Sequence, residues 1–390
     1  MFSISRIQQL MKGLSRGQFD RLVRDSAADK HSKGFGSWDQ LLAMVYAQLS
    51  GAQSLRQLEA GFNSAVAHHY HLGTEVLRRS TLADANARRS PAVFAAAARL
   101  LMGQIGRSAR QEAAQLLYLL DSTSITLEGR GFDAWTQANA TRHTQGIKLH
   151  LLYGADSQTP AWHSFSPANV NDITAALELR IEPGATYVFD KGYCDYNWWA
   201  RIDAAGARFV TRFKRNAALR VHEARPIEPA AAGVVLADEI VGFAKLTPRG
   251  GHRNTYTQSL RRIELARAGH ATSMVLATND LDTPALDIAR RYKDRWQVEL
   301  FFKWIKQHLR VKRFFGRSEN AVRIQILTAL IAYLLLALYR KAHGLSASLW
   351  SVLGELRANL FQRPNIERER YQRRRERLRE ISSRQSALFA

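Results

Sequence analysis

The first part of the chain carries apolar residues at the spacing of a helix. Leu41, Leu42, Val45 and Leu49 recur at intervals of three to four positions, and the stretch 80–89 repeats this period behind Ser and Thr residues that favour a helix start. No continuous or alternating apolar run typical of a parallel strand precedes residue 110. We therefore predict a helical N-terminal domain over residues 1–110.

Short apolar runs replace this pattern in the middle of the chain, and two of them lead directly into an acid. The run 116–120 ends in Asp121, and the run 185–189 ends in Asp190. Runs of this kind are typical of buried strands that deliver a side chain at their carboxyl end. The predicted order is strand, strand, strand, helix, strand, helix, strand, over 116–120, 147–153, 162–165, 171–179, 185–189, 196–205 and 208–212.

This order of elements is that of a ribonuclease-H-like fold. The first and fourth strands are neighbours in such a sheet, so Asp121 and Asp190 are expected to lie close together although they are far apart in the sequence. We predict an α/β protein whose ribonuclease-H-like catalytic core comprises residues 111–215 and 285–340. A β-rich insertion over 216–284 interrupts it, because that segment carries several β-like runs between turn residues.

Two further segments complete the predicted organisation. The uncharged run 324–338 is shorter than the roughly 20 residues that a bilayer span needs, and it contains Gln325 and Thr328, so it is predicted to be a buried core helix. Residues 341–390 form a basic, helical C-terminal region, dense in arginine from 363 to 384, with nucleic acid or a second protomer as its expected partner.

The segment 292–306 is predicted to be a helix with a charged stripe. At 100° per residue, Tyr292, Arg295, Glu299 and Lys306 share one face, beside an apolar stripe that can dock the helix on a core. A carboxylate flanked by cations suits a metal ion next to phosphate oxygens. A solvated face with i,i+4 ion pairs is the alternative, and the helix alone does not decide between them.

Asp121, Asp190 and Glu299 together supply three carboxylates from three rigid elements. Each aspartate alone could be an ordinary turn acid at the end of a strand. The set, in this topological order, favours a site for two Mg²⁺ ions about 3.5–4 Å apart, with Mn²⁺ as a substitute. Such a site activates a nucleophile and stabilises the leaving oxygen in phosphoryl transfer.

Charge and cysteine content narrow the class of protein. The 390 residues carry a formal net charge of +22, which favours a polyanionic partner, although a merely basic protein is the alternative. The single cysteine, Cys194, excludes a disulfide framework and a cysteine-based zinc site and fits a reducing cytoplasm. The first 16 residues lack the apolar region of a secretory signal, so we expect no export.

Three blocks of the sequence resemble the bacterial DDE transposases of the insertion-sequence-four group. They are Asp121 after its apolar run, the run Asp190-Lys191-Gly192-Tyr193, and the spacing Tyr292-x2-Arg295-x3-Glu299-x6-Lys306, which matches the group's Tyr-Arg-Glu-Lys signature. Residues 37–62 and 80–86 are similar to the N-terminal domain often joined to this core. The resemblance covers about residues 1–340.

The resemblance implies a cut-and-paste recombinase. Such an enzyme binds the terminal inverted repeats of its own element, dimerises on them, and catalyses strand cleavage and strand transfer. Its partners would be double-stranded DNA at the transposon ends and the target, and it would be cytoplasmic and nucleoid-associated, without a membrane. The residues carried over are Asp121, Asp190 and Glu299 as metal ligands, Arg212, Lys214 and Asn216 as contacts to end DNA, and Tyr292, Arg295 and Lys306 as holders of the terminal phosphate.

One departure from the group concerns the DNA hairpin through which some members excise. Those members resemble one another in a tryptophan of the β insertion on which a flipped base stacks. This chain has no tryptophan between Asn216 and Arg295, and Trp296 or Tyr256 are the substitutes. The hairpin route therefore stays open. So do two other functions, an inactive DNA-binding regulator derived from a transposase and a ribonuclease-H-like nuclease that does not join strands.

Overall fold

The computed structural model describes most of the chain in two compact units. The described residues are 5–30, 32–112, 115–138, 145–245, 253–267, 269–309, 311, 313–362 and 378. One unit comprises Met1–Leu101 with Ile305–Ala390, and the other comprises Met102–Trp304. Two helices contribute residues to both units, α7 (Ala92–Glu112) and α11 (Trp296–His308).

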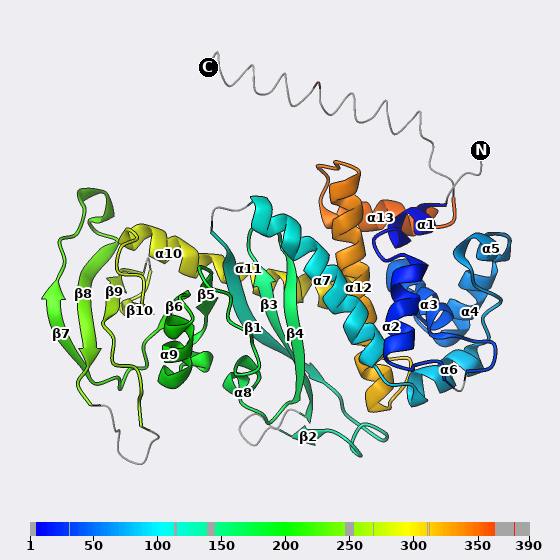
Figure 1. Cartoon of the computed structure of the whole chain (residues 1–390), viewed down its shortest axis with the longest axis horizontal. Coiled ribbons are helices and arrows are strands. Elements are labelled where there is room, and N and C mark those ends of the chain that lie inside the picture. Colours follow the sequence, from blue (N-terminus) through cyan, green and yellow to red (C-terminus); the bar gives the residue numbers. More distant parts are fainter. Residues whose placement is uncertain are drawn as a thin grey trace. The chain divides into compact units, whose positions relative to one another are not determined.

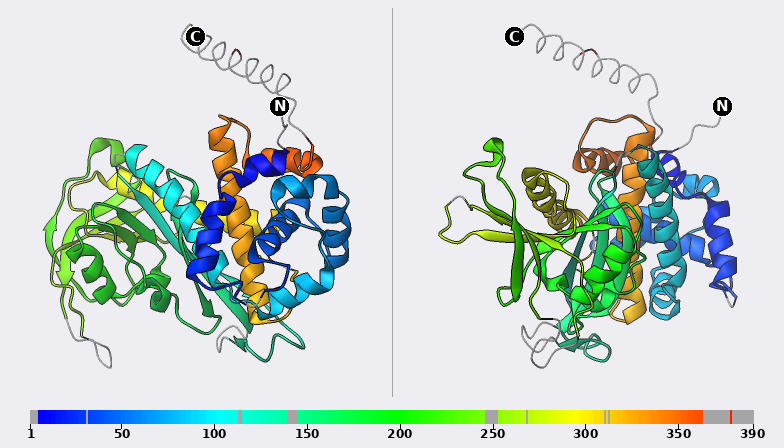
Figure 2. Two further views of the ribbon diagram at one scale, coloured as in Figure 1. Left: turned by 45° about the vertical axis from the view of Figure 1, so that its right-hand side comes forward. Right: turned by 60° about the vertical axis from the view of Figure 1, so that its left-hand side comes forward.

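The first unit is helical (Figures 1 and 2). Its centre is α12 (Glu319–Ala342), a 24-residue helix that packs against α1, α3, α6 and α13. The other elements are α1 (Arg6–Met11), α2 (Arg16–Asp25), α3 (Ser37–Ser50), α4 (Leu55–Asn63), η1 (Val66–His68), α5 (His69–Leu72), α6 (Arg79–Arg88) and α13 (Leu349–Asn359).

α12 confirms the predicted buried helix. It is the one described helix that is long and apolar enough to cross a membrane, but 83% of its most apolar stretch is buried inside the structure. Because α12 packs against the N-terminal helices, residues 305–340 fall in their compact unit, whereas the sequence led us to expect them in the catalytic core. The arginine-dense tail lies outside the described residues beyond 362, apart from residue 378.

The second unit is built on one mixed sheet of ten strands. Its order is β2-β3-β1-β5-β6-β10-β9-β8-β7, with β4 paired to β3. The strands are β1 (Leu117–Thr126), β2 (Gln137–Ala138), β3 (Gln145–Gly154), β4 (Thr159–Pro167), β5 (Thr186–Phe189), β6 (Arg208–Arg212), β7 (Leu219–Ala224), β8 (Val235–Phe243), β9 (Leu260–Leu265) and β10 (Met274–Thr278).

The sheet confirms the predicted ribonuclease-H-like order. β1 and β5 are parallel neighbours, with Leu120 opposite Phe189, so Asp121 and Asp190 follow paired residues. One boundary was predicted wrongly: β1 does not end at Asp121 but continues to Thr126, because its far half still pairs with β3. Asp121 therefore stands where β1 leaves the parallel pair.

The β-rich insertion continues this same sheet. β10 pairs antiparallel with β6, with Leu276 opposite Arg212, and β9, β8 and β7 follow outward. Of these four strands, β7 carried no sequence signal, because its side chains are almost all exposed and show no alternation. A short helical turn, η3 (Pro229–Ala231), lies between β7 and β8.

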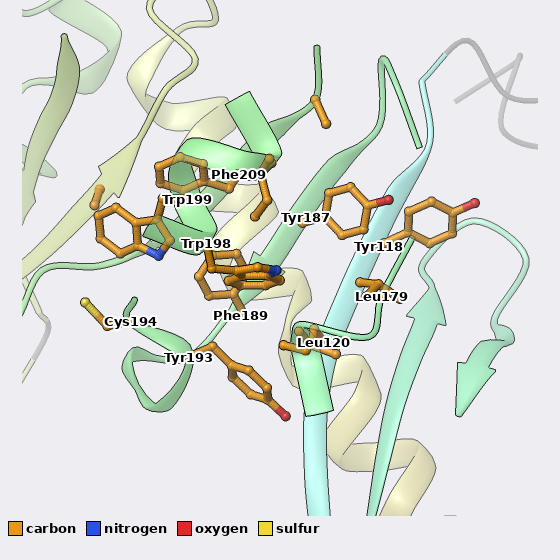
Figure 3. Close-up of a cluster of buried hydrophobic side chains, with 14 of the residues drawn as sticks. Tyr118, Leu120, Leu179, Tyr187, Phe189, Tyr193, Cys194, Trp198, Trp199 and Phe209 are labelled. Carbon is orange, nitrogen blue, oxygen red and sulfur yellow. The ribbon is translucent and has the colours of Figure 1, made fainter. Parts of the chain in front are cut away.

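Helices cover both faces of the sheet. α8 (Asp172–Ala176) and α9 (Tyr196–Ala204) lie on one face, and α10 (Ala285–Asp294) and α11 lie on the other (Figures 1 and 3). Tyr187 and Phe189 of the sheet and Trp198 and Trp199 of α9 are fully buried against one another, with Trp199 and Phe209 ring centroids 4.9 Å apart. This aromatic core fixes β5 and β6, and with them the residues at their carboxyl ends.

Candidate active site

Asp121 points to the α10–α11 face of the sheet. Leu120 belongs to the core on the α9 face, and successive side chains of a strand alternate between faces. The Asp121 carboxylate is accordingly 3.6 Å from the guanidinium of Arg295. Ser122, the next residue, points to the opposite face, where its hydroxyl donates to Asp172.

Asp190 follows β5 and begins a short helical turn, η2 (Lys191–Tyr193), whose backbone N–H at Lys191 it caps. Arg212, the last residue of β6, donates to its carboxylate at 2.8 Å. Burial raises the pKa of Asp190, but the hydrogen bonds from Arg212 and from the Lys191 N–H outweigh it and lower the pKa. The register of β5 and β6 accounts for the pair, because both residues lie two positions beyond the paired Val188 and Val210.

Glu299 lies in the first turn of α11, where its carboxylate accepts from Arg295 at 2.6 Å. The prediction of one continuous helix over 292–306 is wrong. α10 ends at Asp294, and the backbone N–H of Arg295 and of Val298 bond the carbonyl three residues back, at 3.2 and 3.3 Å. Arg295 lies at this tighter turn, and its guanidinium contacts both Asp121 and Glu299.

The three acids are close enough to affect one another. Burial raises the pKa of Asp121 to about 6, and Glu299 and Asp190 add to the rise, whereas the Ser122 N–H and Arg295 oppose it. Asp121 thus lacks full compensation of its negative charge in this arrangement. A further cation beside it would be stabilised.

Asp121→Asn is expected to stabilise the metal-free protein at high pH. A carboxyl of an unfolded chain titrates at about 3.9, so the folded state holds the Asp121 proton more tightly. Deprotonation of Asp121 therefore lowers the free energy of unfolding above pH 6, and this loss disappears as the pH falls through 6 toward 4. The variant should be more stable by on the order of 3 kcal/mol at about pH 8 and nearly unchanged at about pH 4.

Thermal unfolding in a chelator at both pH values measures this effect. The exposed Asp156→Asn serves as the control, for which no pH-dependent gain is expected. A gain that is equal at both pH values would contradict the assignment, because it would not follow the titration of Asp121.

The donor set fits a hard divalent cation, since three carboxylates are the ligands that Mg²⁺ prefers. In this structure the guanidinium groups of Arg295 and Arg212 hold all three carboxylates. Among the described residues, no three His, Cys, Asp or Glu side chains lie close enough together to hold an ion. Binding an ion therefore requires the carboxylates to move closer together, in competition with both arginines for their oxygens.

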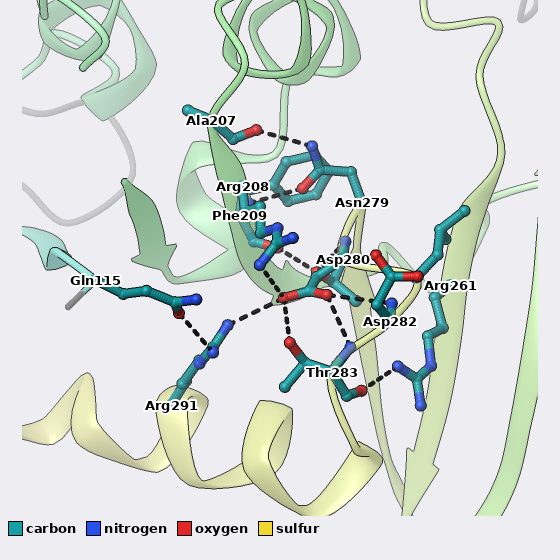
Figure 4. Close-up of polar contacts among 12 residues, drawn as sticks. Gln115, Ala207, Arg208, Phe209, Arg261, Asn279, Asp280, Asp282, Thr283 and Arg291 are labelled. Atoms are coloured by element: carbon teal, nitrogen blue, oxygen red, sulfur yellow. Dashed lines mark hydrogen bonds and ion pairs between the residues drawn. The ribbon is translucent and has the colours of Figure 1, made fainter. Parts of the chain in front are cut away.

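A buried network anchors the helix that leads into this site (Figure 4). Asp280, whose side chain is fully buried after β10, accepts from the N–H and the hydroxyl of Thr283 at 3.0 and 2.7 Å and from Arg291 of α10 at 3.0 Å. Arg291 also donates to Gln115, just before β1, at 3.1 Å. Arg208 of β6 also pairs with Asp280 at 3.5 Å, so the network links α10 to the strands that carry Asp121 and Arg212.

The remaining residues predicted for DNA binding lie at different depths. Tyr292 is buried under Arg295, whose guanidinium carbon is 5.9 Å from the ring centroid. Trp296 is 57% exposed at the start of α11. Lys306 is half-buried in the last turn of α11. It belongs to the other compact unit, which includes the chain from Ile305 onward, so its role beside Glu299 stays a prediction.

A basic groove of about 400 Å³ lies next to Asp190, because Arg212, which pairs with Asp190, also lines the groove. Lys214, predicted to bind DNA, lines it, whereas Asn216 is exposed between two lining residues, Arg215 and Ala217. The sequence analysis missed the cations that the insertion and the η2 turn add. The six cationic side chains of the groove are Lys191, Arg212, Lys214, Arg215, Arg262 and Arg267.

These cations differ in how far their charge is already compensated. Arg262 pairs with Glu239 at 2.8 Å and with Glu264 at 2.6 Å. Lys191, Lys214, Arg215 and Arg267 are exposed. The exposed members are therefore the ones best suited to phosphate oxygens from outside.

Comparison with protein families identifies two matching regions. The model of the transposase DDE domain matches residues 112–335. A second model, described as a domain of unknown function (DUF4372), matches residues 3–75. The first match contains all three acids and both arginines described above.

Individual proteins are also similar to this chain. A Sinorhizobium fredii protein named as the transposase y4zB is 42% identical over 286 residues, which are 73% of this chain and 78% of that protein. A Synechocystis protein named for insertion sequence element IS4SA is 25% identical over 280 residues, 69% of this chain and 73% of the relative. Among solved structures, a piggyBac transposase synaptic complex with hairpin DNA has a TM-score of 0.50 at 10% identity, over 92% of this chain and 80% of that chain.

Proposed function

The chain belongs to the DDE transposases of bacterial insertion sequences, and from this premise we propose that it catalyses cut-and-paste transposition of its own element. It would bind the terminal inverted repeats, act on them as a homodimer, and carry out strand cleavage and strand transfer. Asp121, Asp190 and Glu299 are proposed as the metal ligands. This family of enzymes uses divalent metal ions, and Mg²⁺ is the ion proposed here, with Mn²⁺ as a substitute.

One observation carries the proposal most directly: three acids from β1, β5 and α11 share two arginines. The Arg295 guanidinium contacts Glu299 and Asp121, and that of Arg212 contacts Asp190. When bound, a divalent cation would lower the pKa of the attacking water or hydroxyl and stabilise the leaving oxygen. The arginines released from the carboxylates would then be placed to hold phosphate oxygens.

An assay with the element's own DNA tests the proposal. The substrate is a plasmid carrying the DNA that flanks this reading frame on both sides, incubated with the purified protein, Mg²⁺ and a second plasmid as target. Excision of the segment and its covalent insertion into the target are expected. Binding without cleavage would support the inactive regulator instead, and cleavage without insertion would support a nuclease that does not join strands.

DNA binding is expected to depend strongly on salt and on the exposed cations of the basic groove. Each phosphate contact that is lost lowers the slope of log affinity against log salt by about one. The double variant Arg215→Ala/Arg267→Ala should therefore lose about two from that slope, for inverted-repeat and random duplexes alike.

Fluorescence anisotropy at several salt concentrations measures the slope. Arg290→Ala is the matched control, because Arg290 is an exposed arginine of the same unit that does not line the groove. A slope that is equal for the double variant and the wild type would show that DNA does not use the groove.

Trp296 is proposed as the aromatic surface for an unpaired base if excision proceeds through a hairpin. Its ring is 57% exposed and it directly follows Arg295. Stacking is worth roughly 1–3 kcal/mol per base, so Trp296→Ala should lower hairpin formation by a factor of about 5 to 150. The melting temperature of this variant should change no more than that of Leu300→Ala, because the two side chains are exposed to a similar extent.

Leu300→Ala is the control for this variant. Leu300 lies one turn further along α11 and is 52% exposed, but it offers no ring for stacking. Gel analysis of hairpin products separates the two variants. Equal losses in both would mean that the exposed apolar face of α11 matters only as a packing surface.

A further inference from the structure

Asp172 lies at a junction of four elements on the α8 face of the sheet. It is the first residue of α8, and one of its carboxylate oxygens accepts from the ammonium of Lys148 on β3 and from the hydroxyl of Ser122 on β1, both at 3.0 Å. The Lys148 ammonium also donates to the Val170 carbonyl at 2.7 Å. The carboxylate thereby joins the start of α8 to β3 and to the residue that follows Asp121.

The other carboxylate oxygen faces the turn that follows Asp190. A Cβ added at Gly192 would lie 3.8 Å from it, so the carboxylate lies beside this turn. Tyr193, the next residue, is 1% exposed, and its hydroxyl has no hydrogen-bond partner of good geometry among the described residues. Figure 3 shows this hydroxyl pointing away from the aromatic core. Burial raises the pKa of Tyr193, and the charges of Asp172 and Asp121 add to the rise, whereas the Ser122 side chain opposes it.

From these contacts we infer that Asp172 is a positioning residue, which sets the spacing of Asp121 and Asp190 by holding Ser122 against Lys148 beside the 191–193 turn. It acts from the opposite face of the sheet, through the residue that follows Asp121 and against the turn that follows Asp190. The inference rests on the proposed function, because spacing matters only if the two acids share an ion. Ligand sets need to be held to within about 0.5 Å, which strand pairing alone does not ensure beyond the last pair, Leu120 and Phe189.

Stability alone is a weak reason for such a pair. The side chains of Lys148 and Asp172 are only 13% and 27% exposed, so both charges lose hydration. Apolar residues of similar volume often replace a buried ion pair with neutral or stabilising effect. A charged pair that is bonded to Ser122 and lies beside the turn after Asp190 is better explained by the geometry that it imposes.

The experiment compares Asp172→Ala and Asp172→Asn with the wild type in three measurements. They are Mn²⁺ affinity of the DNA-free protein by electron paramagnetic resonance, the Mg²⁺ concentration for half-maximal cleavage, and the maximal cleavage rate at saturating DNA. Asp172→Ala should weaken Mn²⁺ binding and raise the half-maximal Mg²⁺ concentration by about 10-fold or more, with DNA affinity unchanged. Asp172→Asn should lose less, because an amide oxygen can still accept from Ser122 and Lys148.

Asp238→Asn is the matched control. Asp238 pairs with Arg261 at 2.6 Å, and both side chains are almost fully buried, but the pair lies in the insertion strands β8 and β9. This variant should lower the melting temperature and leave both metal measurements unchanged. If Asp172→Ala behaves in the same way, Asp172 is structural only and the inference is overturned.

Two other results are also decisive. If Asp172→Ala does not fold, Asp172→Asn is compared by itself, and metal measurements within twofold of the wild type would overturn the inference. If the wild type neither binds Mn²⁺ nor cleaves DNA, the proposed function fails and the inference fails with it. If the wild type binds Mn²⁺ and cleaves DNA, and the Asp172 variants match it in both, the inference is overturned and the proposed function stands.

Discussion

Asp190→Asn is expected to abolish strand cleavage while DNA binding persists. An amide at this position still accepts hydrogen bonds from Arg212 and from the Lys191 N–H, so the turn after β5 should keep its shape. The change removes the negative charge that a divalent cation would require. Cleavage should fall by about 10³-fold or more, and the affinity for DNA should stay within about a factor of two, because the groove cations are untouched.

Asp195→Asn is the matched control for this variant. Asp195 lies five residues further on and caps α9 through the Trp198 N–H at 2.8 Å, a role that asparagine performs equally well. Product formation in Mg²⁺ and anisotropy on the same DNA supply both measurements. If Asp190→Asn cleaved at more than about a tenth of the wild-type rate, Asp190 would not be a metal ligand.

Arg295→Gln is expected to change metal affinity and cleavage in opposite directions. The guanidinium of Arg295 holds Glu299 and Asp121 in the DNA-free chain, so removing it frees oxygens that a cation can use. Mn²⁺ should therefore bind more tightly without DNA. Cleavage should nevertheless fall by about 10²–10³-fold, because a charged donor to the phosphate is lost.

Paramagnetic resonance and single-turnover cleavage test the two halves of this prediction separately. Arg290→Gln is the control, since Arg290 is exposed on α10 and pairs only with Asp287 in the described structure. A loss of both metal affinity and cleavage in Arg295→Gln would mean that the arginine supports the fold of the site and does not compete for its carboxylates.

The core of the sheet was predictable because its strands are continuous apolar runs. β5 and β6 match the predicted ranges, and the parallel pairing of β1 with β5 follows from their order in the chain. The exposed strand β7 was not predictable, because almost every side chain of Leu219–Ala224 faces solvent and the hydrophobic pattern that marks a strand is missing. Only its pairing with β8 identifies β7 as a strand.

The contacts within the site were less predictable than its residues. Residue spacing placed Tyr292, Arg295 and Glu299 on one stripe, but it does not report the break between α10 and α11 at Arg295 or the contact of its guanidinium with Asp121 of β1. Asp172 gave no signal at all, since an aspartate in the first turn of a helix is common. Its partners Lys148 and Ser122 come from two neighbouring strands, β3 and β1, which only the folded sheet brings together.

The pairing of β10 with β6 bears on how far chains of this kind could be shortened. A strand without a neighbour presents free N–H and C=O groups to other chains and invites aggregation. β10 covers that side of β6, and the open edge is moved outward to β7, where the charged side chains of Arg220 and Glu223 oppose association. Trimming the outer hairpin of β7 and β8 would leave β6 covered. Deleting β10 would expose the strand that carries Arg212, so the insertion also protects the catalytic sheet from joining its own copies.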